Sequence, residues 1–269
     1  MEEGRGSDAE RPGARRPSLP EGAGQESVHD RLERLERLFY GEVKRGVEAT
    51  VVPAWKRLTV GEARWPVSVA VAVALAMQSA LPRHLILGPR WLLPGIGGVL
   101  VVALVAANPG RIDRTSSALR AGSLLLIAVV SLANGWSAGR LVYGLVTTSE
   151  HANAPQLLLS GGAIWLANVV AFGLWYWELD RGGPVARMVA ARTYPDFMFP
   201  QMENPDLAPP DWEPRFADYF YLSFTNATAF SPTDVMPLSR WAKLTMLAQS
   251  AISLITVALV VARAVNILK

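Results

Sequence analysis

A hydroxyl-rich segment that ends in an acid is the part of the sequence most suggestive of chemistry. It follows a run of aromatic residues and carries Thr225, Thr228, Ser231, Thr233 and Asp234. In channels, rings of oxygen atoms or of acidic side chains replace the water shell of a passing ion. These five residues are therefore our candidates for the constriction of a pore.

The aromatic run before these residues indicates how they are positioned. It begins at Phe216 and continues for about three helical turns, which is too short to cross a bilayer. Irregular polar backbone at membrane depth is tolerated only where protein or a water-filled cavity surrounds it. The segment therefore predicts a re-entrant hairpin.

A second set of polar side chains lies on one face of the last apolar segment. Gln249, Ser253 and Thr256 follow one another at steps of four and three, which places them along one side of a helix. On a membrane helix such a face meets protein or water rather than lipid. Two interpretations are open: the three residues line a cavity that leads to the constriction, or they form hydrogen bonds between helices.

Arg140 is a candidate for a charge inside the membrane, because it lies within a long apolar stretch. It either pairs with a carboxylate or lies near a helix end from which its side chain reaches the interface. The carboxylates available for such a pair are Glu178, Asp180 and Asp234.

The sequence contains no pattern that predicts catalysis or metal binding. It has no Cys, and its three His residues lie on separate segments at spacings that do not suit a metal. No Ser/His/Asp arrangement or pair of carboxylates stands out. We expect a protein that is not an enzyme and that uses no cofactor and no metal.

The composition places these residues in a membrane protein. Of the 269 residues, 51% are hydrophobic and only 18% are charged, and the mean hydropathy of +0.21 is too high for an ordinary soluble domain. Five apolar segments approach or reach the length of about 20 residues that crosses a bilayer. They are Trp65–Leu81, Trp91–Ala107, Ala118–Val146, Leu157–Trp177 and Trp241–Leu268.

The chain divides into four parts. Residues 1–27 are rich in Gly, Pro and charge and predict a disordered tail, whereas apolar residues at steps of three and four predict an amphipathic helical segment in 28–64. That helix lies in the cytoplasmic headgroup layer, forms a coiled coil, or packs on the bundle. Residues 65–180 form a region of four transmembrane helices. Residues 181–269 contain a Pro- and aromatic-rich loop, the re-entrant helix and the last transmembrane helix.

These observations predict an all-α fold, an integral membrane helical bundle. It has five transmembrane helices, a re-entrant pore-like helix and an N-terminal amphipathic helix. Basic residues concentrate in the N-terminal segment and in 108–120, which predicts a cytoplasmic N-terminus in a multi-pass protein of the plasma membrane. The net charge is only +3, and the basic residues form no face that could follow nucleic acid. We therefore expect the lipid bilayer, and no nucleic acid, as a partner.

The stretch from Tyr221 to Asp234 and the apolar helix after it resemble the pore module of potassium channels. The resemblance implies a pore helix, a filter and an inner helix. The filter glycines of that family are replaced, which implies a pore without potassium selectivity. Ser223, Phe224, Thr225 and Asp234 match the family pattern, Thr228 and Ala229 fall at its two threonine positions, and Ser231, Pro232 and Thr233 fall on its Gly-Tyr-Gly.

The same stretch is also similar to an uncharacterised bacterial family of multi-pass membrane proteins, a domain of unknown function. Its members share an acidic and aromatic exit from the fourth span, a short helix, a Ser/Thr-Asp turn and a last span. The resemblance implies a membrane fold and no particular activity. The matching residues are Asp218, Tyr221, Leu222, Ser223, Phe224, Thr225, Phe230, Ser231 and Asp234.

Two functions are open at this point. The first is a channel-like pore for ions or small solutes, which requires a symmetric homo-oligomer because a single five-span chain cannot enclose a pore. The second is a membrane scaffold that transports nothing. In that function the loop Tyr194–Trp212 and the helix Val28–Val51 dock a protein partner.

Overall fold

The computed structural model describes residues 53–107, 110–112, 116–147, 153–228 and 234–267. The chain divides into two units, 1–51 and 52–269, and every described residue belongs to the second. The predicted tail, 1–27, and the predicted helix Val28–Val51 therefore lie outside the described residues.

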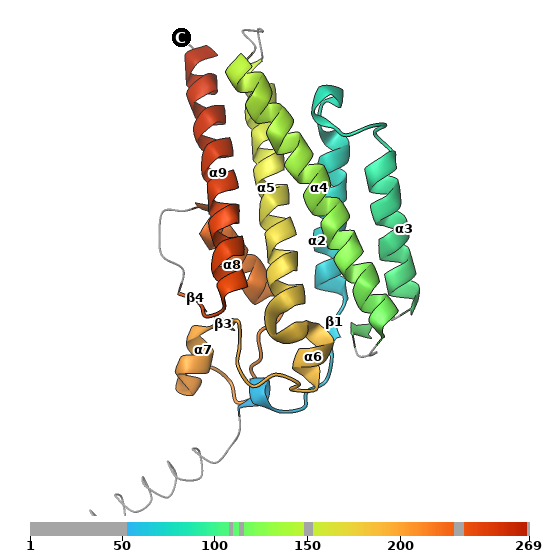
Figure 1. The fold of residues 1–269 in the computed structure, drawn as a ribbon, viewed down its shortest axis with the longest axis vertical. Coiled ribbons are helices and arrows are strands. Elements are labelled where there is room, and N and C mark those ends of the chain that lie inside the picture. Colours follow the sequence, from blue (N-terminus) through green and yellow to red (C-terminus); the bar gives the residue numbers. More distant parts are fainter. Residues whose placement is uncertain (1–52, 108–109, 113–115, 148–152, 229–233, 268–269) are drawn as a thin grey trace, which may run out of the picture. The chain divides into compact units, whose positions relative to one another are not determined.

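A bundle of long helices makes up most of the second unit (Figure 1). Each helix coincides with one of the five apolar segments of the sequence, which confirms the helical fold class. The helices are α2 (Trp65–Ala80), α3 (Leu92–Ala107), α4 (Ser117–Thr147), α5 (Ala154–Leu179) and α9 (Arg240–Ile267).

Three of these helices are long and apolar enough to cross a membrane, namely α4, α9 and α5 with its short extension to Gly182. By contrast, α2 and α3 have 16 residues each. A helix of that length rises about 24 Å, which is less than the hydrocarbon core of about 30 Å. The structure supports a membrane protein with three such helices, and the predicted number of five spans is not confirmed.

Helix α5 lies at the centre of the bundle. Within its apolar stretch 61% of the residues are buried, against 28% for α4 and for α9, and it contacts α2, α4, α8 and α9. Small residues allow this close packing. A Cβ atom at Gly173 would lie 3.3 Å from the Cα atom of Phe220, so the missing side chain lets the next helix, α8, approach the α5 backbone.

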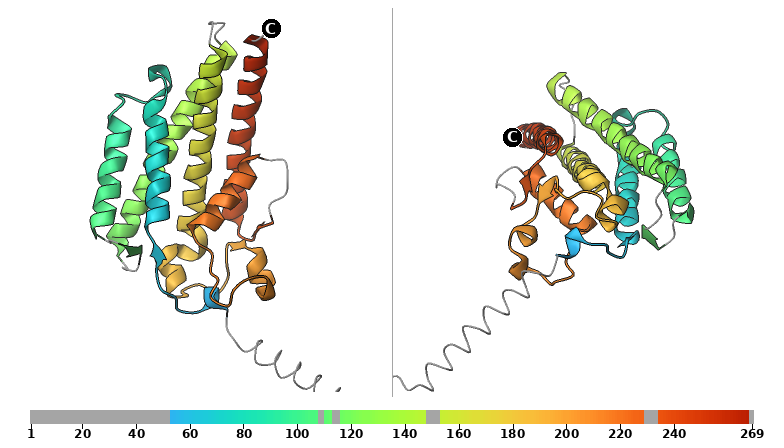
Figure 2. Two further views of the ribbon diagram at one scale, coloured as in Figure 1. Left: turned by 180° about the vertical axis from the view of Figure 1, so that it is seen from behind. Right: turned by 60° about the horizontal axis from the view of Figure 1, so that its bottom comes forward.

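The predicted short helix is present as α8 (Phe216–Thr228), which packs against α5 and α9. Its 13 residues rise about 20 Å, too little to cross a bilayer. In Figure 2 it lies beside the lower parts of α5 and α9, near the end of the bundle where the short elements gather.

We call residues 53–63 and 180–215 the cap, because they lie together at one end of the bundle (Figures 1 and 2). The strand β1 (Glu62–Ala63) pairs antiparallel with β2 (Arg111–Ile112), and β3 (Phe197–Met198) pairs antiparallel with β4 (Met236–Pro237). The helical turns of the cap are η1 (Ala54–Lys56), η3 (Asp180–Gly182), α6 (Pro184–Met188), α7 (Pro200–Glu203) and η4 (Pro205–Leu207). The turn η2 (Arg83–Leu85) lies at the opposite end, between α2 and α3.

Aromatic rings join the cap to the bundle. Phe197 is completely buried, with its ring centroid 5.1 Å from that of Tyr176 and 5.5 Å from that of Trp241. Phe199 packs edge-on against Tyr219 at 5.3 Å. The Pro-rich stretch predicted as a docking loop therefore contributes two of its aromatic residues to the hydrophobic core.

Candidate functional site

The polar face of α9 packs against protein within a single chain. Gln249 is fully buried, and its Oε1 accepts hydrogen bonds from Tyr176 Oη at 2.6 Å and from Asn226 Nδ2 at 2.8 Å. Its Nε2 donates to the backbone oxygen of Ser223 at 2.9 Å and to the Ser223 hydroxyl at 2.7 Å. Both ends of the amide are thus satisfied, and one side chain joins α5, α8 and α9.

The other two residues of this face are buried as well. Ser253 Oγ accepts a hydrogen bond from Asn168 Nδ2 of α5 at 3.0 Å, and Thr256 donates to the backbone oxygen of Ile252 at 2.8 Å. For Gln249 and Ser253 the geometry supports hydrogen bonding between helices, whereas the bond of Thr256 stays within α9. We call Tyr176, Ser223, Asn226 and Gln249 the neutral network.

Three of the constriction candidates lie within the described residues, two of them on α8. Thr225 donates to backbone oxygens of its own helix at 3.0 Å, and Thr228 donates to the backbone oxygen of Thr225 at 2.7 Å. Asp234 is exposed. The remaining two candidates, Ser231 and Thr233, lie outside the described residues.

Arg140 lies near the end of the bundle that is opposite to the cap. It is exposed, and its Nε donates to the backbone oxygen of His84 at 3.2 Å. Two of its proposed carboxylate partners, Glu178 and Asp180, are buried at the cap end of α5. The geometry supports the interpretation that its side chain lies near a helix end.

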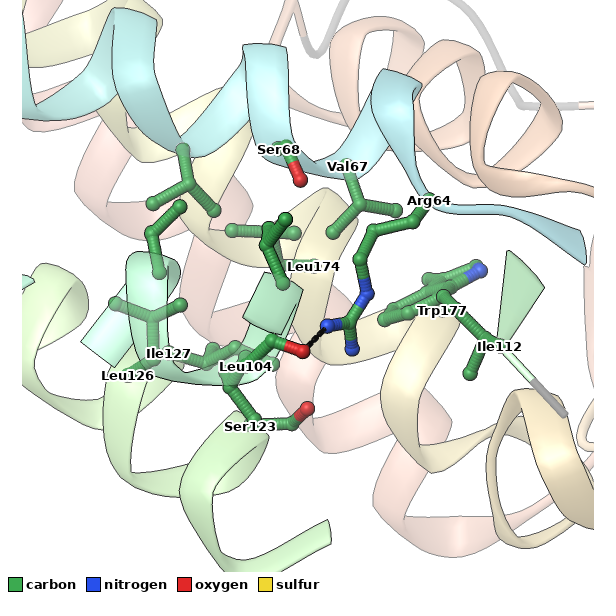
Figure 3. A pocket seen from close by; sticks show the side chains of 13 residues that line it. Arg64, Val67, Ser68, Leu104, Ile112, Ser123, Leu126, Ile127, Leu174 and Trp177 are labelled. Carbon is green, nitrogen blue, oxygen red and sulfur yellow. Dashed lines mark hydrogen bonds between the residues drawn. The ribbon is translucent and has the colours of Figure 1, made fainter. Parts of the chain in front are cut away.

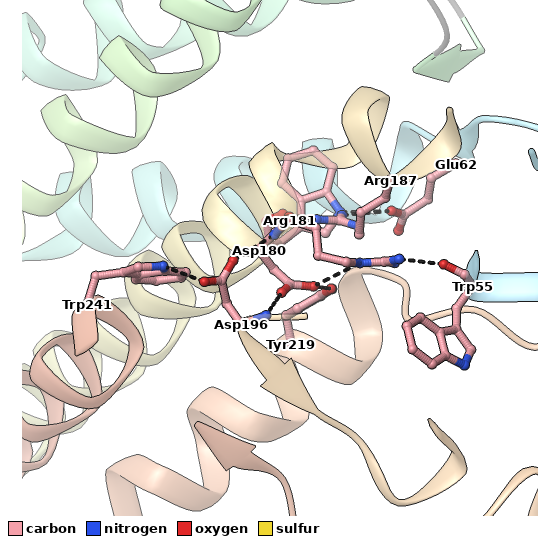
Figure 4. Close-up of polar contacts among 9 residues, drawn as sticks. Trp55, Glu62, Asp180, Arg181, Arg187, Asp196, Tyr219 and Trp241 are labelled. Atoms are coloured by element: carbon pink, nitrogen blue, oxygen red, sulfur yellow. Dashed lines mark hydrogen bonds and ion pairs between the residues drawn. The ribbon is translucent and has the colours of Figure 1, made fainter. Parts of the chain in front are cut away.

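A cluster of buried and half-buried polar groups, most of them charged and not anticipated from the sequence, joins the cap to the bundle (Figure 4). We call it the cap cluster. It arises where α5 ends, because Arg181 has a φ of +51° and is followed by Gly182 and Gly183, both also at positive φ. This reversal turns the chain back under the bundle and buries the side chains next to it. The members of the cap cluster are Glu62, Asp180, Arg181, Arg187, Asp196 and Tyr219.

Asp180 is the most enclosed member of the cap cluster. One of its carboxylate oxygens accepts the backbone N–H of Asp196 at 2.9 Å, and the other accepts the hydroxyl of Tyr219 and lies 3.8 Å from Nε of Arg181. Asp196 in turn accepts the backbone N–H of Arg181 and the indole N–H of Trp241, both at 2.8 Å. Two carboxylates thus bind four segments of the chain together.

The two arginines anchor the cap to backbone oxygens. Arg187 donates to the backbone oxygens of Trp177 at 2.6 Å and Asp180 at 3.0 Å, and Arg181 donates to that of Trp55. Glu62 lies 4.0 Å from Arg187 and accepts hydrogen bonds from the Trp177 indole at 2.7 Å and the Phe216 backbone N–H at 2.6 Å.

The chemistry of the cap cluster is that of a structural clamp. Burial raises the pKa of Glu62, although the hydrogen bonds from Phe216 and Trp177 and the charge of Arg187 lower it in part. Among the residues that the structure describes, no three His, Asp or Glu side chains are grouped so that they could hold a metal ion. The sequence does carry a signal for the cluster. Charged residues and two glycines directly follow the aromatic end of α5, which is typical of a chain reversal next to charged side chains.

No family model, no curated protein and no solved structure matches the chain.

Proposed function

We propose that the protein is a scaffold of the plasma membrane that transports nothing, in which the bundle anchors the cap and the cap docks a protein partner. The carrying observation is the neutral network, because Gln249 satisfies all of its hydrogen bonds within one chain. A polar face that is occupied in this way is not available to line a water-filled path.

The cap supports the docking part of the proposal. The cap cluster fixes the cap to the bundle. The cap nevertheless exposes large apolar side chains to water. In the segment Tyr194–Trp212, Tyr194 is 85% exposed and Leu207 is 69% exposed. By contrast, Phe197 and Phe199 of the same segment are buried. A rigid surface with exposed apolar residues suits a partner better than a mobile loop, because less entropy is lost on binding.

An oligomeric pore is the second candidate. The observation in its favour is α8, a helix too short to span that is followed along the sequence by a hydroxyl-rich segment and Asp234. This function requires several copies of the chain around a common axis.

Ion flux distinguishes the two functions. We expect liposomes containing the purified protein to release K⁺ and Na⁺ no faster than protein-free liposomes, and we expect a monomer in mild detergent. A pore predicts a faster flux that is lost in a variant combining Thr225→Ala, Thr228→Ala and Asp234→Asn. Such a result, with an oligomer of defined size, contradicts the scaffold.

Thiol labelling tests the packing of α9 and the orientation, because the chain has no Cys. In the scaffold, Ser253→Cys in the folded protein does not react with a membrane-impermeant thiol reagent. The exposed control, Asp206→Cys in the cap, reacts in inverted vesicles and not in intact cells if the cap is cytoplasmic. Rapid labelling of Ser253→Cys shows water at the polar face of α9 and favours the pore.

Photocrosslinking tests the docking surface. A photoreactive amino acid at Leu207 is expected to give a discrete crosslinked protein band in the native membrane. The same amino acid at the exposed Arg83, at the opposite end of the bundle, serves as the control and is expected to give none. Crosslinks at Leu207 to lipid only contradict a docking role of the cap.

A further inference from the structure

A cavity of about 470 Å³ lies where the cap meets the bundle. Its walls come from the start of α4, the end of α5, and the turn formed by η3 and α6. Its size falls within the range of about 300–1,000 Å³ that is usual for sites of small ligands. It is therefore large enough for a ligand.

Two arginines make one side of this cavity basic. Arg64 precedes α2 and is only 9% exposed, while Arg120 lies in the first turns of α4 and is exposed. The hydroxyls of Ser116, Ser117 and Ser123 line the same cavity. Arginine and hydroxyl donors at the start of a helix suit a phosphate group.

The guanidinium of Arg64 is only partly satisfied. It donates through Nη1 to the backbone oxygen of Leu104, but among the described residues its buried Nε has no hydrogen-bond partner (Figure 3). A buried donor of a charged group without an acceptor is costly. Arg64 therefore has hydrogen-bonding capacity to spare at the wall of the cavity.

The cavity also contains an acid with an unused oxygen. Glu178 is 3% exposed, and within the described part of the chain its Oε2 accepts no hydrogen bond. The charges of Arg187, Arg120 and Arg64 already act on this carboxylate, and a purely anionic ligand would compete with it for the two arginines of the cavity. A ligand that carries both a phosphate and a primary ammonium group satisfies the arginines and Glu178 together.

An apolar crevice adjoins the polar cavity. It has a volume of about 40 Å³, lies among α2, α3, α4 and α5, and shares Arg64, Ile112, Ser123 and Trp177 with the larger cavity. In Figure 3 the Arg64 guanidinium lies between the Leu104 backbone oxygen and the Trp177 ring, with aliphatic side chains beyond it. A polar cavity next to an apolar crevice suits an amphiphile whose chains remain largely in the bilayer.

The level of the cavity agrees with that of lipid headgroups. Trp65 directly follows Arg64 and is 69% exposed at the start of α2. Exposed Trp residues at the ends of membrane helices prefer the interface between headgroups and hydrocarbon. The cavity next to Arg64 therefore lies at headgroup depth.

We propose that this cavity binds the headgroup of an aminophospholipid, with the phosphodiester held by Arg64 and Arg120 and the ammonium group held by Glu178. This site shares no residue with the neutral network or with the segment Tyr194–Trp212. The proposal therefore stands or falls separately from the scaffold function.

Lipid titration of the purified full chain, followed by native mass spectrometry, tests the proposal. Phosphatidylethanolamine is expected to bind about tenfold more tightly than phosphatidylcholine, which cannot donate from its nitrogen, and than phosphatidylglycerol, which has no cation. Equal or tighter binding of phosphatidylglycerol overturns the assignment. Soluble glycerophosphoethanolamine is the second arm, and binding as tight as that of the lipid shows a water-soluble ligand instead.

Three matched variants assign the roles. Arg120→Gln is expected to weaken phosphatidylethanolamine and phosphatidylglycerol alike by about tenfold, and Glu178→Gln is expected to remove the preference between the two lipids. Arg83→Gln, at an exposed position of the opposite end, leaves both unchanged. Because Arg120 is exposed, its variant keeps the fold even if Glu178→Gln is unstable. If Arg120→Gln behaves like Arg83→Gln, the proposal is wrong.

Discussion

The neutral network and the cap cluster are both buried and polar, but they differ in charge and in place. The neutral network consists of amide and hydroxyl groups between the helices α5, α8 and α9. The cap cluster consists of carboxylates and guanidinium groups where α5 ends and the cap begins. A charge is far more costly than an amide inside hydrocarbon, which is consistent with charged groups at the end of the bundle and neutral groups between its helices. The first region holds helices together, and the second holds the cap in place.

The largest expected effect comes from breaking the cap cluster. Asp180→Ala removes the carboxylate that accepts hydrogen bonds from the Tyr219 hydroxyl and the Asp196 backbone N–H. It also removes the ion-pair partner of Arg181. Because buried charges are left without a partner, we expect the free energy of unfolding to fall by about 3–5 kcal/mol. Denaturant titration in detergent measures this change, with the exposed Asp206→Ala as the control. Equal stability of the two variants contradicts a closed cluster.

The next effect concerns the contact that brings α8 to the neutral network. Gly173→Ala places a Cβ atom 3.3 Å from the Cα atom of Phe220, so α5 and α8 must separate. We expect a loss of about 2 kcal/mol in the free energy of unfolding, as for other overpacked cores. Gly162→Ala on the same helix meets nothing within 4 Å and is expected to be neutral or stabilising. A similar loss in both variants would show that the close approach of Phe220 to Gly173 is not the cause.

Breaking the neutral network itself should cost less than breaking the cap cluster. Gln249→Leu leaves the hydroxyls of Tyr176 and Ser223 and the amide of Asn226 without this partner. Hydrogen bonds between membrane helices are worth about 0.6 kcal/mol on average, so a loss of about 1–2 kcal/mol is expected. The control on the same helix is the exposed Leu247→Ala. If Gln249→Leu costs as much as Asp180→Ala, the distinction between the two regions fails.

The smallest effect is a dependence on pH within the cap cluster. The pKa of Glu62 is raised by burial, so in the folded state it loses its proton at a higher pH than in the unfolded state. The contribution of Glu62 to stability therefore falls as the pH rises from the ordinary pKa of 4.5 to the raised pKa of the folded state, and it is constant above that pKa.

Glu62→Gln abolishes this dependence on pH. The difference in thermal stability between the wild type and Glu62→Gln is expected to move in favour of the variant as the pH rises through that window. Glu203→Gln, at an exposed position of α7, should show no such trend. A wild-type advantage that grows with pH means that the partners of Glu62 outweigh its burial.

The two regions also differ in how far they can be read from the sequence. The spacing of Gln249, Ser253 and Thr256 placed them on one face of a helix, but the choice between a cavity and hydrogen bonds depended on Tyr176, Ser223 and Asn168 of other helices. For the cap cluster even the members were missed, because Glu62 meets Trp177 and Phe216 across 115 and 154 positions of the chain.

The sequence by itself determined the elements that depend on local hydropathy. The five apolar segments became α2, α3, α4, α5 and α9, and the aromatic run became the short α8, because apolar periodicity and length act within one segment. Only the tertiary structure decided which polar groups meet. It gave Arg140 the carbonyl of His84 in place of a carboxylate, ordered the Pro-rich stretch around Phe197, and left Arg64 and Glu178 with unused groups in a cavity. The physical reason is that hydrogen bonds and ion pairs act over a few ångströms in space, whatever the distance along the chain.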